Sequence, residues 1–507
     1  MISVAPVAGV PQVENSAKRL ALYLVGGALL SKVLGLVREV LVARAVGASM
    51  IADAFRGGQT ACLLPLLVLQ SESVPAILIP IYREWREDGS APRRFAALTV
   101  ALTMVAALLF IVVEAIAPFW IDVLLAGFSE QAHDLTLTFT RVMATAMPAS
   151  VLMSCLAGSE IARGQSRTTS IRATLANVAV IMGVVVFLLT KDPVVLAWSF
   201  ALAFNLTALW ALWRGIREGA LDFSRLEYRE IWASFTIYMR RLRPLLMQPV
   251  GEHALIWIER LLASGLAVGT LASLDYARTL TDCAVLLVSQ PIGLAVLSRG
   301  PSANLHGQMD MLARPVLAMA IPSSIFLVFF APEIVELVFH RGAFDAAAIE
   351  STSEILRGIA AGLWATTLGW ILIRMLNSVG RNRRATLIVS TGYFANILTG
   401  ALLVRQFGGA ALGIGEAVRG IVILIGVGLA LGCGRHLLRL LGMMVPVAVA
   451  FGLCEWLVRA EVHGLFPRLL AGVAVMLLTM LLSICLLVPR ARALVCYRFD
   501  SISHRRV

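Results

Sequence analysis

The chain has 507 residues, of which 59% are hydrophobic and only 15% are charged. A soluble protein carries about 25% charged residues, so the composition excludes a soluble domain and indicates a chain that lies mostly in lipid. The formal net charge of +12 is explained by basic cytoplasmic loops, so we expect no nucleic acid as a partner.

Long apolar stretches recur from one end of the chain to the other. A helix needs roughly 20 apolar residues to cross about 30 Å of hydrocarbon. We predict fourteen spans, near residues 20–46, 60–82, 95–118, 137–159, 172–190, 193–213, 242–264, 268–298, 314–338, 355–379, 385–404, 410–434, 440–458 and 467–489. The longest polar stretch, about 214–241, fits an amphipathic connector. The sequence therefore predicts an all-α multi-pass membrane protein.

The first span carries charges where lipid is expected. The stretch "SKVLGLVREVLVARAVGASMIADAF" (31–55) begins within this span, and Lys32, Arg38, Glu39 and Arg44 lie inside the span. A charged side chain at the centre of a spanning helix costs roughly 2.5–3.5 kcal/mol on insertion scales. These residues therefore need a water-filled cavity or partners on other helices. A cavity lined by several cations favours an anionic substrate, and arginine suits phosphate because its planar fork donates two hydrogen bonds.

The loops predict the orientation of the chain. Basic residues gather in alternate loops, as in Lys18 and Arg19 and in "GRNRR" at 380–384, whereas the opposite loops are poorer in arginine. By the positive-inside rule, both termini lie in the cytoplasm, as an even number of spans requires. Residues 1–17 lack the features of a secretory signal, so we expect them to stay attached as a cytoplasmic segment.

A spacing pattern occurs twice and predicts two similar halves. The pattern R-x8-G-x5-D-x2-R appears in two sets that are 222 residues apart, Arg38, Gly47, Asp53 and Arg56, and then Arg260, Gly269, Asp275 and Arg278. Six spans return a chain to the side where it began, so the halves would be parallel lobes with a site at their interface. We predict an N-lobe at 18–220, a C-lobe at 221–435, a helix pair at 436–490 and a basic tail at 491–507.

The intramembrane charges have simpler explanations as well. Glu39 could neutralise Arg38, and Glu252 and Glu259 could neutralise Arg260, while Arg44 and Arg56 could reach the outer interface with their long side chains. Histidines and cysteines show no metal-ligand spacing, and the chain has no Walker A, Rossmann or nucleophile motif. We therefore expect no enzyme and no cofactor, with Na⁺, H⁺ or the membrane potential as the source of energy.

Four stretches carry a family resemblance, namely the first-helix stretch quoted above, "IERLLASGLAVGTLASLDYARTL" (258–280), "FHRGAFD" (339–345) and "ATLANV" (173–178). They resemble the MurJ/MviN lipid II flippases of the MOP exporter superfamily, which also holds the MATE drug exporters. The resemblance implies two lobes that rock around a cationic cavity. It also implies that Lys32, Arg38, Asp53 and the region of Arg278 match positions important for transport.

The chain departs from the family pattern at positions that face the substrate. Lys32 replaces the first arginine of the motif, and "PLLVLQSESVPA" (65–76) lacks an arginine pair expected there. In "YARTL", Arg278 lies one residue earlier than the arginine of the family pattern Y-A-x-R-L. After the tenth predicted span, "MLNSVGRNRR" lacks the aromatic motif of the family. These differences favour a lipid-linked glycan other than lipid II, such as an exopolysaccharide repeat unit.

We predict a flippase that moves an undecaprenyl-pyrophosphate-linked oligosaccharide, either lipid II-like or an exopolysaccharide unit, across the bacterial cytoplasmic membrane by alternating access. Two alternatives stay open, a cation-coupled MATE-like exporter of drugs or metabolites and a non-transporting scaffold of a glycan-synthesis complex. Glycosyltransferases and a polymerase are the expected protein partners. The predicted pyrophosphate site comprises Lys32, Arg38, Arg260, Arg278 and Asp53, with Arg44, Arg56, Glu39, Glu259 and Arg374 as weaker candidates.

Overall fold

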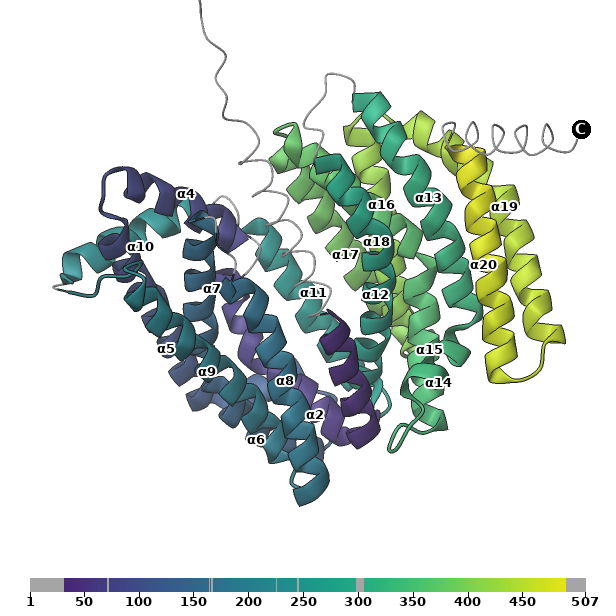
Figure 1. Ribbon diagram of the computed structural model, residues 1–507. Helices are drawn as coiled ribbons and strands as arrows, with labels where there is room; N and C mark the ends of the chain where they lie inside the picture. The colour runs from purple at the N-terminus through teal and green to yellow at the C-terminus, as the bar shows by residue number, and fades with distance from the viewer. Residues whose placement is uncertain are drawn as a thin grey trace, which may run out of the picture. The chain divides into compact units, whose positions relative to one another are not determined.

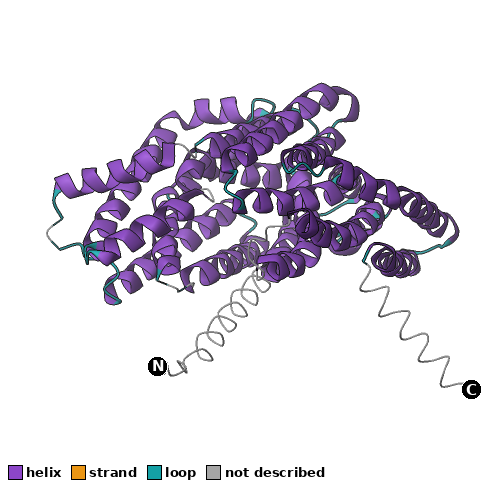
Figure 2. Cartoon of the chain, turned by 90° about the horizontal axis from the view of Figure 1, so that it is seen from above, coloured by secondary structure: helices purple, strands orange, loops and turns teal. Residues whose placement is uncertain are grey.

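The computed structural model describes residues 32–70, 73–163, 165, 167–224, 226–243, 246–297 and 305–488. Throughout this part of the chain the regular elements are helices, and Figure 2 shows no strand among them. The predicted segment 1–17, the first part of the predicted span 20–46 and the basic tail 491–507 lie outside the described residues. The predicted all-α class is confirmed.

The described chain divides into two compact units that do not follow chain order. The first unit contains described residues up to Leu41 together with Pro65–Ala115 and Arg141–Arg243. The second contains Val42–Leu64, Ile116–Thr140 and the described residues from 246 onward. The predicted boundaries of two lobes and a C-terminal helix pair stay predictions.

The helices of the first unit begin with residues 32–41 of a helix that runs over residues 32–46. Those that follow in this unit are α3 (Leu67–Gln70), α4 (Ser73–Glu87), α5 (Ala91–Leu124), α7 (Met147–Ala162), α8 (Arg167–Thr190), α9 (Val194–Arg217) and α10 (Tyr228–Leu242) (Figure 1). Helix α5 continues into the second unit. Gly183 of α8 lies so close to Ser199 of α9 that a methyl group there would collide with the serine side chain. Small residues at such contacts let membrane helices approach closely.

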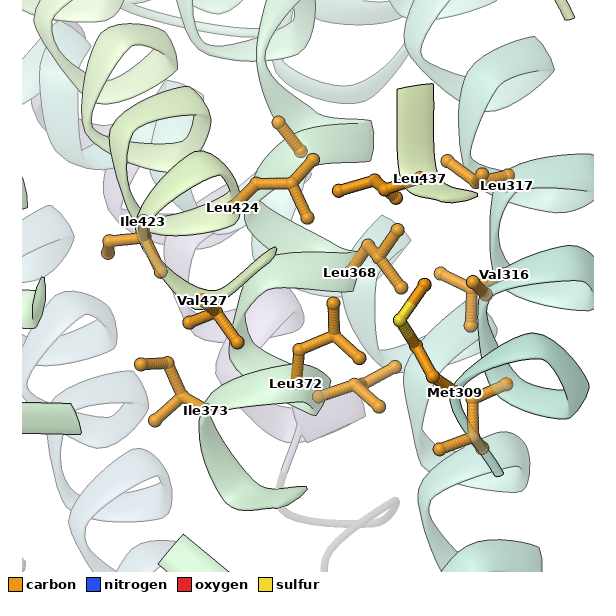
Figure 3. Packing of buried hydrophobic residues seen from close by; sticks show 14 of the residues in the cluster. Met309, Val316, Leu317, Leu368, Leu372, Ile373, Ile423, Leu424, Val427 and Leu437 are labelled. Carbon is orange, nitrogen blue, oxygen red and sulfur yellow. The ribbon is translucent and has the colours of Figure 1, made fainter. Parts of the chain in front are cut away.

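A large apolar core lies among the helices of the second unit. They are α2 (Met50–Leu63), most of α6 (Glu130–Ala144), α11 (Met247–Ser264), α12 (Thr270–Leu297), α13 (Leu305–Phe329), α14 (Ala331–Phe339), α15 (Ala346–Ala361), α16 (Leu363–Ser378), α17 (Asn382–Phe407), α18 (Ala410–Ala430), α19 (Gly434–Glu461) and α20 (Leu465–Leu487). Figure 3 shows side chains of α13, α16, α18 and α19 meeting in this core. Gly413 of α18 touches Gly358 of α15, so α18 lies close to its neighbours.

Eight helices in the described part of the chain are long and apolar enough to cross a membrane. Two further spans arise if each bent pair counts as one, α6 with α7 at 45° and α15 with α16 at 49°. The chain is therefore a multi-pass membrane protein. The predicted total of fourteen spans and the cytoplasmic termini stay predictions.

Candidate functional site

The first described helix holds an arginine that is paired with a buried acid. Nη1 of Arg38 donates a hydrogen bond of 3.0 Å to Oδ1 of Asn177 on α8, and its Nη2 pairs with the Glu39 carboxylate. The Arg38 side chain is 28% exposed, whereas the Glu39 side chain is 3% exposed. The structure thus pairs Arg38 with Glu39, and it leaves part of the Arg38 side chain accessible. Lys32 is exposed on the same helix.

The helix ends at a turn that the repeated pattern explains. Gly47 has φ +64°, and Gly269, the matching glycine of the second copy, has φ +91°. Only glycine adopts this left-handed region without strain. The hydroxyl of Tyr276 donates a 3.0 Å hydrogen bond to the Gly47 carbonyl. Both copies of the pattern therefore encode a glycine turn.

Residues of the "FHRGAFD" stretch support the same turn from outside. The amide of Ala343 donates a 2.9 Å hydrogen bond to the carbonyl of Arg44. A methyl group on Gly47 would collide with the backbone carbonyl of Ala343. The described contacts of Arg44 in this turn are therefore made by its backbone, and its side chain is exposed.

Asp53 binds the beginning of a helix rather than a cation. Its two carboxylate oxygens accept hydrogen bonds from the amides of Gly269 (2.6 Å) and Ala272 (2.8 Å), and the residue is 5% exposed. The first amides of α12 have no partner within their own helix, and the positive end of the helix dipole favours an anion there. Asp53 thus caps α12 from α2.

A second acidic residue joins two arginines from different helices. Asp275 of α12 accepts a 2.8 Å hydrogen bond from Nη2 of Arg260, and its other oxygen lies 3.5 Å from Nε of Arg56. The Arg56 side chain is 8% exposed. The interpretation that Arg56 extends to the outer interface is therefore wrong, because it is buried against an acid. Arg260 pairs with Asp275, where the sequence had suggested Glu252 or Glu259.

Arg278 lies between two buried carboxylates. Its Nη2 donates to Glu259 of α11 at 2.7 Å and to Glu416 of α18 at 2.6 Å. Asn396 of α17 donates to the other oxygen of Glu259 at 3.0 Å, and Arg419 pairs with Glu416. Glu259 and Glu416 are 3% and 7% exposed. We call these five side chains the four-helix network, since they come from α11, α12, α17 and α18.

Sequence reasoning missed Glu416, Asn396 and Arg419. Glu416 is the only acidic residue of the predicted span 410–434, and an intramembrane acid is by default a residue of interest. That signal could have found it. The amide of Asn396 carries no such signal. Arg374, a weaker candidate, is exposed on α16 and belongs to none of these ion pairs.

Comparison with known proteins identifies the family. A model of the family "Lipid II flippase MurJ" matches residues 42–484. The chain belongs to the MurJ lipid II flippase family. This membership confirms the predicted resemblance and the predicted function class, a flippase for a lipid-linked precursor. It also places this MurJ-family chain among transporters rather than catalysts.

The sequences of individual relatives align with this MurJ-family chain over most of its length. The lipid II flippase MurJ of Burkholderia cenocepacia is 27% identical over 459 residues, which cover 84% of this chain and 83% of that protein. A probable lipid II flippase MurJ of Thermotoga maritima is 22% identical over 381 residues, covering 74% and 76%.

Solved structures show the fold. A lipid II flippase MurJ in an inward closed conformation matches with a TM-score of 0.79 at 15% identity, covering 92% of this chain and 99% of that one. An inward-facing multidrug resistance MATE transporter of the MOP superfamily matches with a TM-score of 0.61 at 15% identity, covering 82% and 96%. This MurJ-family chain therefore has the fold shared by the MOP exporters.

Proposed function

We propose that this chain moves an undecaprenyl-pyrophosphate-linked glycan from the inner to the outer leaflet of the bacterial cytoplasmic membrane by alternating access. The observation that carries the proposal is the family match over residues 42–484. In this proposal fourteen helices cross the membrane and both termini lie in the cytoplasm.

The partly exposed Arg38 is the residue best suited to meet the pyrophosphate. Glu39 and Asn177 hold its guanidinium in place, and a planar guanidinium can donate two parallel hydrogen bonds to phosphate oxygens. Lys32 lies six residues earlier, about 9 Å along the helix, and is exposed. Its ammonium adds a second positive charge for a diphosphate.

The capped turn and the buried acids serve as the outer latch in this proposal. Residues 42–64 and 116–140 precede α11 in the chain, yet they pack within the second unit. Opening toward the outer leaflet would separate them from α12. That motion would break the Asp53 cap and the contact between Arg56 and Asp275. Two of the nitrogens of Arg260 have no hydrogen-bond partner among the described residues, so after opening they could bind the departing phosphate.

No bound cofactor is needed for such a cycle. A gradient of Na⁺ or H⁺, or the membrane potential, would drive it, and the potential supplies about 2.3 kcal/mol per charge per 100 mV. Enzymes that make and use the lipid-linked glycan, namely glycosyltransferases and a polymerase, are the protein partners that fit this role.

Two cargoes fit the proposal. The names of the relatives favour lipid II. Lys32 in place of an arginine and the neutral stretch at 65–76 favour another lipid-linked glycan, because fewer bidentate donors are present for the headgroup.

Complementation separates these cargoes. The chain is expressed in a bacterium whose own lipid II flippase is shut off, together with Lys32→Ala/Arg38→Ala and with Arg405→Ala, a matched loss of an exposed arginine on α17. Growth that is lost only in the double variant shows lipid II as cargo. If no variant supports growth despite membrane expression, surface polysaccharide is scored in the native host. If the chain does not complement and the double variant retains surface polysaccharide in the native host, the result argues against transport through Lys32 and Arg38 and favours the scaffold.

A further inference from the structure

Helix α10 is docked on the first unit by one of its faces. It begins with a capping box in which Glu227 and Glu230 bond each other's backbone amides. Its buried residues are Ser234, Tyr238 and Leu242, which follow one another at intervals of four and so form one line along the helix. Helix α10 packs against α4 (Figure 1).

Two ion pairs hold this docking in place. Arg241 donates to both carboxylate oxygens of Glu84 on α4, at 2.9 and 2.6 Å. Arg93 of α5 donates to Glu230 at 2.9 Å. The helix is thus fixed in its rotation, so the direction of its other faces is determined.

The next face around α10 is apolar and uncovered. Tyr228 is 77% exposed and Trp232 is 60% exposed. The ring of Phe235 lies beside that of Trp232, with 5.9 Å between the ring centroids. Met239 continues the line one turn later. Large aromatic side chains at the surface of a membrane protein are typical of the boundary between lipid and water.

A basic ridge borders the aromatic face. Arg229 and Arg240 are exposed. They are eleven positions apart, which is close to three full turns, so they lie on one side of the helix. Neither belongs to the ion pairs that dock α10. Around the helix the order is therefore docked face, aromatic face and basic ridge.

We propose that α10 is a membrane-surface helix that binds anionic phospholipids. Tyr228, Trp232 and Phe235 insert among the acyl chains near the headgroups, while Arg229 and Arg240 pair with lipid phosphates. An amphipathic helix with aromatic residues on one face and arginines beside them suits an anionic leaflet. The charge complementarity selects lipid over an apolar protein partner, since a protein groove would leave both arginines at its rim. The proposal concerns lipid recognition and does not depend on the identity of the cargo.

The binding has a consequence for the chain beyond α10. Only four residues separate Leu242 from Met247, where α11 begins, and α11 carries Glu259 and Arg260. A lipid-bound α10 would fix the point at which the chain passes from the first unit to the second. Anionic lipid would then restrict the motion of α11 during the transport cycle.

The test uses the full chain in nanodiscs of phosphatidylcholine, with or without phosphatidylglycerol. Brominated phosphatidylglycerol quenches the fluorescence of nearby tryptophan, and the difference between wild type and Trp232→Phe isolates Trp232 among the ten tryptophans. Hydrogen exchange of the α10 amides reports binding independently. We expect quenching and slowed exchange in the anionic discs. Each arginine contributes about fivefold to affinity for an anionic surface, so Arg229→Ala/Arg240→Ala should weaken binding roughly 30-fold.

Two further variants separate charge from folding. Arg229→Lys/Arg240→Lys keeps both charges and should bind nearly as well as wild type, because a lipid surface does not need the planar fork. Arg383→Ala/Arg384→Ala removes two exposed arginines at the start of α17 and should leave α10 exchange unchanged. Equal quenching in neutral and anionic discs overturns the anionic preference. Absence of quenching shows that lipid does not reach Trp232 and overturns lipid binding. Neither result involves cargo, so the flippase proposal would stand.

Discussion

Arg38 and Arg278 show how differently the chain treats two intramembrane arginines. Arg38 contacts one carboxylate and one amide, and its side chain is 28% exposed, close to the 25% of Arg278. Arg278 is held by two buried carboxylates, one of which also binds Arg419 and the other Asn396. The acid beside Arg38 is its neighbour in the chain, whereas the two acids beside Arg278 come from two other helices, α11 and α18. Loss of Arg278 should therefore disturb the packing of helices more than loss of Arg38.

The largest expected effect is on stability, at Arg278. Arg278→Ala leaves Glu259 and Glu416 buried with one cation fewer, and breaking a buried pair costs about 3–5 kcal/mol. We expect a clear fall in the melting temperature of the detergent-solubilised protein. Arg278→Lys should recover part of the loss, since it restores the charge. An unchanged melting temperature of the alanine variant would show that the four-helix network does not stabilise the fold.

The matched change at the other arginine should affect transport instead. Arg38→Lys keeps the charge near Glu39 but loses the fork, which removes a charge-assisted hydrogen bond to phosphate worth about 1.5–3 kcal/mol. We expect a roughly 10- to 100-fold loss of cargo affinity with little change in melting temperature. Binding of purified lipid-linked pyrophosphate measures the first quantity. Equal losses of stability in Arg38→Lys and Arg278→Lys would abolish the proposed difference between the two regions.

A smaller effect is expected at the cap of α12. Asp53→Ala removes the acceptor for the amides of Gly269 and Ala272, and loss of a helix cap costs about 0.5–2 kcal/mol. Hydrogen exchange at these two amides should accelerate. Asp53→Asn, which keeps one acceptor oxygen, should protect one of the two amides. Unaltered exchange in Asp53→Ala would contradict the cap.

The smallest effect concerns pH at the surface of the first unit. The hydrogen bonds from Arg241 hold the pKa of Glu84 below its ordinary value of 4.5. Because the folded pKa is lowered, the contribution of this pair is present above pH 4.5 and disappears as the pH falls through the folded pKa. Proteolysis of the segment around α10 should therefore stay constant at neutral pH and rise only in acid. In Glu84→Gln the rise with acid should be absent.

Sequence reasoning located the important charges better than it assigned their partners. Arg38, Arg260 and Arg278 stood out because charges in apolar spans are rare, and the repeated pattern marked both glycine turns. Partners were harder to predict. Arg278 and Glu416 are 138 residues apart. They do not form a local pair, so no rule based on sequence spacing could detect their contact. Asp53 was predicted near the pyrophosphate, yet in this structure backbone amides occupy its carboxylate.

The sequence by itself determined that the chain is helical, lies in a membrane and carries cations within its spans. Those properties follow from the hydrophobicity of neighbouring residues added along each span, because the free energy of inserting a helix depends on its own side chains. Only the tertiary structure decided which acids each cation contacts. That choice depends on which helices meet, and a rotation by one residue, about 100°, turns a side chain away from its partner.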